Sequence, residues 1–586
     1  MGRVKTAGAL RAHNDSDNRD APVTDARNLC IRRLGWLVLL LAISVLPGAA
    51  QPLSLAPVKW FDADNAHIPE PVETVENQVW DIADHTFFYQ LGKPLDLRWT
   101  ARSVGRLLRI AGPRQADNVN VLDEVPGSSW FANRHFHFAL TPAQLAEGPG
   151  RAVPDTSGPW QIVAGKFEGG TAGFTVKDGV GVYFLLKFDS EGNKEMGSAA
   201  EVVATKILHA AGYNVPRNSI VYFRPSRLQI GPKATVPTST GGKRRMELAD
   251  VQAILNSIEP EPDGRLRCVA SKFLSGAPVG FFNYDGRRPD DPNDRVEHQH
   301  RRELRGLRVL GAWLNDADRR AANTLDMYVS EDEGRRRYVK HYLIDMGSAL
   351  GSNNLMPHMP KYGNEYVWDP RTIARSIVSL GLWRKPWEEP LPMSYRTIGY
   401  FETQTFEPHS WVPTYPNPAF EQMTMRDAYW GAKIVMSFSD EDLAAIVATG
   451  QYTEEPGAAA ELTRLLSVRR DMIGRYYFGR VNPLDRFRVS RQDLAFSDLA
   501  VEFGLETAAG NQYQVQLLDA DGKATGTPRL IDVTRLDVSD LPAGQFHGAE
   551  LRTDRGGAEG WSKATRVFFY FHDDGRAQLV RIDRET

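Results

Sequence analysis

Three polar residues in the middle of the chain have the types and spacing that phosphoryl transfer requires. Asp318 and Asn323 lie five residues apart, and Asp345 follows 22 residues after Asn323. Asp345 opens a short glycine turn after the strand-like run Tyr342–Ile344. A phosphoryl-transfer site uses one acid beside the acceptor hydroxyl, and an amide with a second acid to hold magnesium. Each residue alone is typical of a turn or a helix cap, so the prediction rests on their combination.

Two charged residues upstream complete this set. Lys187 lies in the apolar run Val182–Phe188, where its ammonium needs an anion such as a nucleotide phosphate or a carboxylate. The alternative is a lysine on an edge strand that faces water. Glu201 lies in Ser198–Ala211, which has helical periodicity and a glycine stop at Gly212. Glutamates on helices are usually solvated, and only the order of these residues favours an ion pair with Lys187.

Two further segments are candidates for binding a nucleotide. The stretch 165–173 is rich in glycine, and Gly169, Gly170 and Gly173 would let backbone amides approach phosphate oxygens. Taken alone, this stretch is better explained as a plain hairpin turn, and the nucleotide interpretation gains from Lys187, which follows it. The stretch 269–276 reads as a strand that enters a turn and links two lobes, where the backbone near Phe273 and Ser275 would hold adenine.

The order Lys187, Glu201, Asp318, Asn323 and Asp345 resembles the atypical kinase-like superfamily. Its similar branches are the HipA-type kinases, the phosphoinositide 3/4-kinases, and the secreted CotH and Golgi casein kinases. The resemblance is one of motif order, over roughly residues 160–350. It implies a two-lobed fold that binds ATP with magnesium. Lys187 would contact phosphates, Glu201 would orient Lys187, Asp318 would be the catalytic acid, and Asn323 and Asp345 would be metal ligands.

The chain departs from the usual kinase pattern at two places. No His-Arg pair precedes Asp318, and Met346 stands where a phenylalanine is usual. Asp316 competes with Asp318 for the role of base, and the spacing to Asn323 favours Asp318.

His135 and His137 alternate in a strand-like run and form a weaker metal candidate. Ordinary surface histidines are the simpler interpretation of this pair.

The N-terminus predicts export. Arg32 and Arg33 precede the apolar run Leu34–Leu46, and small residues follow up to Ala50. This pattern is typical of a signal peptide cut near Ala50, which would make the protein periplasmic or extracellular. The alternative is an uncleaved membrane anchor. After cleavage Cys268 would be the single cysteine, so no intrachain disulfide is expected.

The composition indicates an exported globular protein of several domains. Hydrophobic residues make up 42% of the chain, and the net charge of −3 gives no sign of nucleic-acid binding. We expect an α+β fold: a two-lobed kinase-like core with an N-terminal extension and a C-terminal all-β module. The predicted parts are a polar lead with a signal peptide, a mixed region, a kinase-like domain and a β-sandwich-like module, with bounds 1–50, 51–157, 158–480 and 484–586.

Three functions follow from these features. The first is an exported ATP- and magnesium-dependent phosphotransferase, whose partners are a nucleotide and an unknown protein, glycan or small-molecule acceptor. The second is a kinase-like enzyme that transfers AMP instead of phosphate. The third is a non-catalytic kinase-fold protein that binds a component of the cell envelope. Contact with a membrane is expected only through an uncleaved signal segment.

Overall fold

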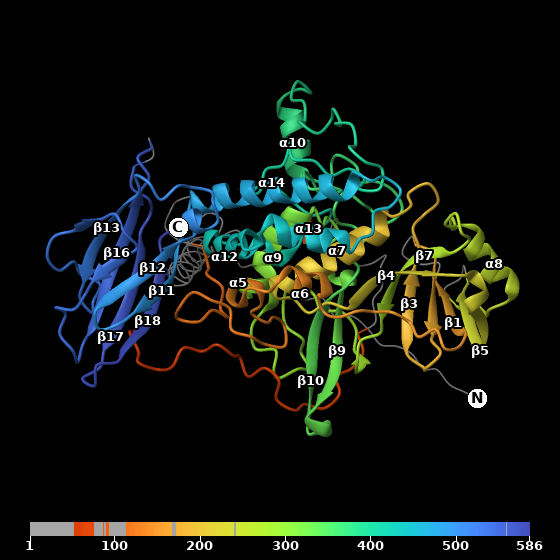
Figure 1. Ribbon diagram of the computed structural model, residues 1–586, viewed down its shortest axis with the longest axis horizontal. Coiled ribbons are helices and arrows are strands. Elements are labelled where there is room, and N and C mark those ends of the chain that lie inside the picture. Colours follow the sequence, from red (N-terminus) through yellow and green to blue (C-terminus); the bar gives the residue numbers. More distant parts are fainter. Residues whose placement is uncertain are drawn as a thin grey trace, which may run out of the picture. The chain divides into compact units, whose positions relative to one another are not determined.

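The computed structural model describes residues 52–74, 86, 89–92, 113–166, 171–238, 242–557 and 560–586. All but Pro113 belong to one compact unit, made of Gln51–Gly92 and Arg114–Thr586. Helices and strands are mixed up to residue 478, and strands dominate after it (Figure 1). The predicted α+β class is therefore confirmed, and so is a C-terminal region rich in strands. The predicted signal segment lies outside the described residues, and no helix within them is long and apolar enough to cross a membrane.

A seven-stranded mixed sheet forms the first half of the region that carries the predicted site. Its spatial order is β4-β7-β3-β2-β1-β5-β6. Neighbouring strands are antiparallel, except that β1 and β5 run parallel. The strands are β1 Trp160–Lys166, β2 Gly173–Lys177, β3 Tyr183–Lys187, β4 Arg217–Phe223, β5 Leu228–Pro237, β6 Lys243–Arg245 and β7 Leu266–Lys272.

The two faces of this sheet carry different elements. Phe184 and Leu186 of β3 are buried in a cluster that includes residues of α8 (Leu248–Asn256). Successive side chains of a strand point to opposite faces, so Lys187 points to the other one. The helix α7 (Met196–Ala211) packs on β4 and β7 at that second face. The alternation of one short strand therefore directs Lys187 toward α7.

A mainly helical part follows. The helix α9 (Arg302–Leu314) has leucines at helical spacing, and they are buried in the largest core cluster. The helix ends at Asn315, which adopts a left-handed conformation with φ of 48°. Residues 296–301, which precede α9, contain a 3-10 turn at His298–His300. The other helices here are α10 Pro370–Val378, α11 Pro418–Glu421, α12 Met425–Met436, α13 Asp440–Ala448 and α14 Ala458–Phe478.

A small sheet links the two parts. β9 (Thr324–Glu331) and β10 (Arg336–Leu343) form an antiparallel hairpin, and β8 (Ala277–Pro278) pairs with β9 (Figure 1). The four residues 273–276 run from the end of β7 in the large sheet to β8 in the small one. They occupy the linking position that the sequence predicted for them.

The C-terminal region contains two sheets around one apolar cluster. The first has the order β11-β12-β15 and the second β14-β13-β16-β17-β18. A buried ionic cluster joins this region to the helices, because Asp485 pairs with Arg584 of β18 and with Lys433 of α12, both at 2.9 Å. The bounds are β11 Leu484–Val489, β12 Asp493–Asp498, α15 Leu499–Glu502, β13 Gln512–Leu518, β14 Arg529–Ile531, β15 Arg535–Asp537, β16 Phe546–Asp554, β17 Thr565–Phe571 and β18 Ala577–Arg584.

The described residues of the N-terminal part form three short helices, α3 (Tyr89–Gly92), α5 (His135–Phe138) and α6 (Pro142–Glu147). The strand expected around His135 and His137 is wrong, because these residues form α5. His135 is buried and lies 3.0 Å from the carbonyl of Ser437, so tertiary contacts decide the conformation of this short apolar run. The predicted domain bounds stay a prediction.

Candidate functional site

The centre of the site is an ion-paired lysine. The ammonium of Lys187 lies 2.9 Å from a carboxylate oxygen of Glu201 and 3.2 Å from one of Asp345. Lys187 and Glu201 are nearly buried, while 32% of the Asp345 side chain is exposed. Burial alone would lower the pKa of Lys187, but the two carboxylates outweigh it and raise that pKa. Lys187 therefore keeps its charge and holds α7 and the turn at Asp345 together.

The second carboxylate oxygen of Glu201 is also held. Asn218 at the start of β4 donates its amide to this oxygen at 2.9 Å and to the hydroxyl of Thr205 at 3.0 Å. Glu201 lies within the buried length of α7, whose N-terminus is fixed by Asp189 accepting bonds from the backbone of Glu195 and Ser198. One carboxylate oxygen of Glu201 thus accepts from Asn218, and the other pairs with Lys187.

The turn after β10 places Asp345. Asp345 has a left-handed backbone, with φ of 54°, two residues after the last residue of β10. Burial favours its neutral form, but the charges of Lys187 and then Lys166 outweigh this effect and lower the pKa of Asp345 to about 2. A Cβ atom at Gly347 would lie 1.9 Å from the side-chain oxygen of Asn354, so a larger residue here would displace the amide of Asn354. Asp345 is ionised at neutral pH and partly open to solvent.

A buried arginine holds the loop of Asp318 against the turn of Asp345. Arg319 pairs with Asp316 at 2.8 Å and donates to the carbonyls of Asn323 and Ile344. Arg319 is 1% exposed, and its anionic partner is the buried Asp316 of the same loop. Burial raises the pKa of Asp316 to about 6, although Arg319 acts against this shift. Asp316 and Arg319 therefore position the loop.

Asp318 and Asn323 contact each other within this loop. The amide of Asn323 donates to the carboxylate of Asp318 at 3.0 Å and to its carbonyl at 2.6 Å. Arg320 lies 3.1 Å from the other carboxylate oxygen. Burial raises the pKa of Asp318, and the charge of Asp345 adds to this shift. Of the two acids proposed as base, Asp318 is the more accessible, with 28% of its side chain exposed against 2% for Asp316.

The glycine-rich stretch lies beside the same lysine. Gly169 and Gly170 are outside the described residues. Gly173 pairs with Lys166 on one side and Lys187 on the other, so both lysines face the same side of the sheet across a residue without a side chain. A Cβ atom at Gly173 would lie 2.3 Å from the carbonyl oxygen of the adjacent strand, so close strand packing requires this glycine.

The predicted adenine contacts lie at the link between the sheets. Phe273 is 51% exposed, and its ring lies 5.9 Å from that of Tyr183. Ser275 is exposed in the same four-residue link. Both residues also line a pocket of about 270 Å³. No direct contact joins them to Lys187, and their role in binding a nucleotide stays a prediction.

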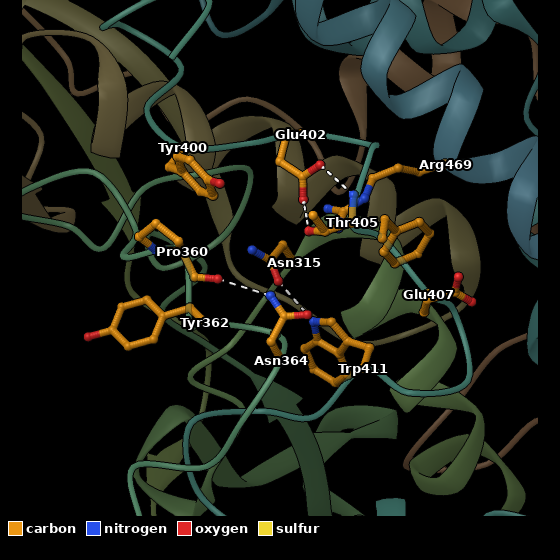
Figure 2. A pocket seen from close by; sticks show the side chains of 12 residues that line it. Asn315, Pro360, Tyr362, Asn364, Tyr400, Glu402, Thr405, Glu407, Trp411 and Arg469 are labelled. Atoms are coloured by element: carbon orange, nitrogen blue, oxygen red, sulfur yellow. Dashed lines mark hydrogen bonds between the residues drawn. The ribbon is translucent and has the colours of Figure 1, made fainter. Parts of the chain in front are cut away.

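A small pocket lies next to the Asp318 loop (Figure 2). Its lining includes Asn315, whose amide oxygen accepts from the indole of Trp411 at 2.9 Å, and Tyr362, whose pKa is raised by burial and by the charge of Asp318. Arg469 is buried over the rings of Phe401 and Phe406, and no described residue bonds its Nε or Nη1. The cavity of about 20 Å³ has room for about one water-sized molecule.

The donors at the site fit a hard divalent cation. Asp345 offers a carboxylate, and Asn323 offers its amide oxygen because the amide nitrogen donates to Asp318. Magnesium binds through one or two carboxylates together with substrate phosphates. Among the described residues, no group of three or more His, Cys, Asp or Glu side chains is arranged to hold a metal ion. His135 and His137 belong to no such group.

Sequence reasoning missed two residues of this arrangement, Lys166 and Asn218, and did not find the role of a third, Asp316. Lys166 lay inside the glycine-rich stretch, and its position opposite Gly173 would have suggested it. Asn218 begins a strand and carried no recognisable signal. The sequence presented Asp316 as a competing base. Its burial and its ion pair with Arg319 show that it positions the loop instead.

Comparison with known proteins gives two distant structural similarities. No family model matches the chain, and no curated protein matches it. A crystal structure of a Golgi casein kinase with manganese and ADP bound is 11% identical, covers 49% of this chain and 75% of that chain, and has a TM-score of 0.22. A second structure of a Golgi casein kinase is 11% identical, covers 72% and 97% of the two chains, and has a TM-score of 0.22. Because these scores are low, the interpretation of the site rests on its own contacts.

Proposed function

We propose that this protein is a kinase-like phosphotransferase that uses ATP with magnesium and acts outside the cytoplasm. The observation that carries the proposal is the contact of Lys187 with Glu201 and Asp345, which lie 14 and 158 residues away in the sequence. A lysine that pairs with a helix glutamate beside a metal-binding acid is the arrangement that holds nucleotide phosphates in kinases.

Each residue has a distinct task in this proposal. Lys187, oriented by Glu201, would bind phosphate oxygens, and Lys166 would add a second positive charge on the same side. Asn323 and Asp345 would hold the cation, which would neutralise part of the phosphate charge when bound. Asp318 would accept the proton of the acceptor hydroxyl, and its raised pKa brings it closer to the range that suits a base.

The site also supports a prediction about how magnesium and nucleotide affect each other's binding. Lys187 pairs directly with Asp345 at 3.2 Å. A phosphate with its cation would compete for both partners, so binding of either alone is expected to be weaker than binding of both. Magnesium and nucleotide should therefore bind cooperatively.

A thermal-shift titration with ATP and magnesium tests this function. The wild type should show a stabilisation that needs both ligands, of about 2.7 kcal/mol when the ligand is 100-fold above its Kd. Asp345→Ala and Asn323→Ala should lose it. Asp521→Ala is the matched control, because Asp521 is an exposed acid in a C-terminal hairpin.

Each outcome decides between the functions considered. A shift that survives in both site variants overturns the ligand assignment. Absence of any magnesium-dependent nucleotide binding in the wild type overturns the phosphotransferase and favours a non-catalytic envelope-binding protein. Mass spectrometry of products after incubation with ATP separates transfer of phosphate from transfer of AMP.

A further inference from the structure

A basic pocket of about 270 Å³ lies where α7 ends, beside the link 273–276. Four cationic residues line it: Arg134, Arg217, Lys272 and Lys340. All its lining residues belong to the described part of the chain, and none of them is acidic. This concentration of one charge sign in a concave site is the electrostatic pattern that attracts anions.

Two of the cations oppose each other directly. Arg217, the first residue of β4, pairs in register with Lys272, the last residue of β7. Like charges at directly opposite positions of an antiparallel pair are destabilising. The side chain of Arg217 also runs close to the backbone of Gly150, where a Cβ atom would lie 3.4 Å from its Nε. The fold therefore keeps two positive charges together at a net cost unless an anion joins them.

The third cation comes from the other sheet. Lys340 of β10 lies with its ammonium 5.9 Å from the ring of Tyr342. Burial lowers the pKa of Lys340, Glu331 acts against this shift, and Arg134 adds to it. Burial lowers the pKa of His209 to about 3, with further lowering by Arg134 and Lys206, so this imidazole stays neutral.

No described carboxylate forms a hydrogen bond or ion pair with these cations, and the charge of Glu331 acts on Lys340 only from a longer distance. Arg134 donates to the carbonyls of His209 and Tyr213, at 2.7 and 2.9 Å, and is thereby held in place. The charged ends of Arg217, Lys272 and Lys340 make no hydrogen bond or ion pair with a described residue. Three unpaired cations from two sheets therefore line one cavity.

We propose that this pocket binds a phosphorylated small molecule, with Arg217, Lys272 and Lys340 contacting the phosphate. A cavity of this size is close to the lower range for small-ligand sites, and the ring of Tyr342 offers an apolar surface to the organic part of the ligand. The ligand would join the seven-stranded sheet to the β9–β10 hairpin. The proposed phosphate contacts Arg217, Lys272 and Lys340 are none of the residues assigned to the ATP phosphates or the metal. The pocket shares Phe273 and Ser275 with the link that was predicted to hold adenine.

Isothermal titration calorimetry with inorganic phosphate and with glycerol 3-phosphate tests the proposal. Titrations are run at constant ionic strength, without divalent cations. Both should bind the wild type saturably, the ester more tightly. Arg217→Gln and Lys340→Gln should each weaken binding at least tenfold. Lys233→Gln, at an exposed position of β5, should bind as the wild type does.

Other outcomes overturn the proposal. They are absence of saturable binding, or binding that both pocket variants retain. Equal affinity for phosphate and ester would overturn the assignment to an organic phosphate. The variants should fold, because the replaced charges make no bonds within the protein. Without ligand, Arg217→Gln should melt at or above the wild-type temperature, since it removes the repulsion with Lys272.

Discussion

Replacing Lys187 by methionine is the sharpest test of the central ion pair. The variant keeps the length and apolar stem of the side chain but removes the cation between Glu201 and Asp345. Glu201 is 3% exposed, and its carboxylate would keep only the one hydrogen bond that Asn218 donates. Removing one partner of a buried ion pair costs about 3–5 kcal/mol, because the other charge stays buried without compensation.

The pH dependence of stability shows how much of this loss comes from the ionised carboxylate of Asp345. An aspartate with a pKa of about 2 in the folded state, against about 3.9 unfolded, contributes about 2.6 kcal/mol to stability near neutral pH. A third of the Asp345 side chain is exposed, so we expect ~2 kcal/mol after screening by solvent. A lowered folded pKa stabilises above the unfolded pKa, and this contribution disappears as the pH falls through the folded value. The variant should therefore approach the wild type between pH 5 and about pH 2.

Urea unfolding at a series of pH values measures this difference. The free energy of unfolding of Lys187→Met should fall below that of the wild type by about 3–5 kcal/mol at pH 7, and the gap should narrow by ~2 kcal/mol toward pH 2. Lys233→Met, an exposed lysine in the same sheet, is the control and should change little. A loss no larger than that of the control, or a gap that does not depend on pH, would refute the ion-pair reasoning.

Three further predictions follow from the structure. Asp318→Asn should abolish transfer and keep nucleotide binding, whereas Asp316→Asn should mainly lower stability because Asp316 is buried against Arg319; parallel measurement of turnover, affinity and melting separates them, and the reverse pattern would exchange the two roles. Gly173→Ala should destabilise by at least ~2 kcal/mol in urea unfolding, since its Cβ would meet a strand carbonyl, while Gly557→Ala, in open space, should be neutral; equal effects would contradict the strand packing. N-terminal sequencing of envelope material should begin just after Ala50, and a start before the apolar run would mean an uncleaved anchor.

Local sequence patterns were enough to predict several helices and strands and the order of the candidate residues along the chain. The leucine spacing of α9, the helix that ends at Gly212 and the hairpin that follows Asn323 are all set by short-range periodicity and turn residues. The strand predicted around His135 was wrong, because four residues carry too little periodic signal to outweigh tertiary contacts.

By itself the sequence determined an α+β chain with a strand-rich C-terminus and a set of polar residues suited to phosphoryl transfer. Only the tertiary structure decided which of them meet. Lys187 reaches Asp345 across 158 residues, and Asn218 reaches Glu201, because strand pairing and helix packing set these distances. The basic pocket has the same origin. Arg217, Lys272 and Lys340 come from three separate strands, and no sequence spacing connects them before the two sheets are folded together.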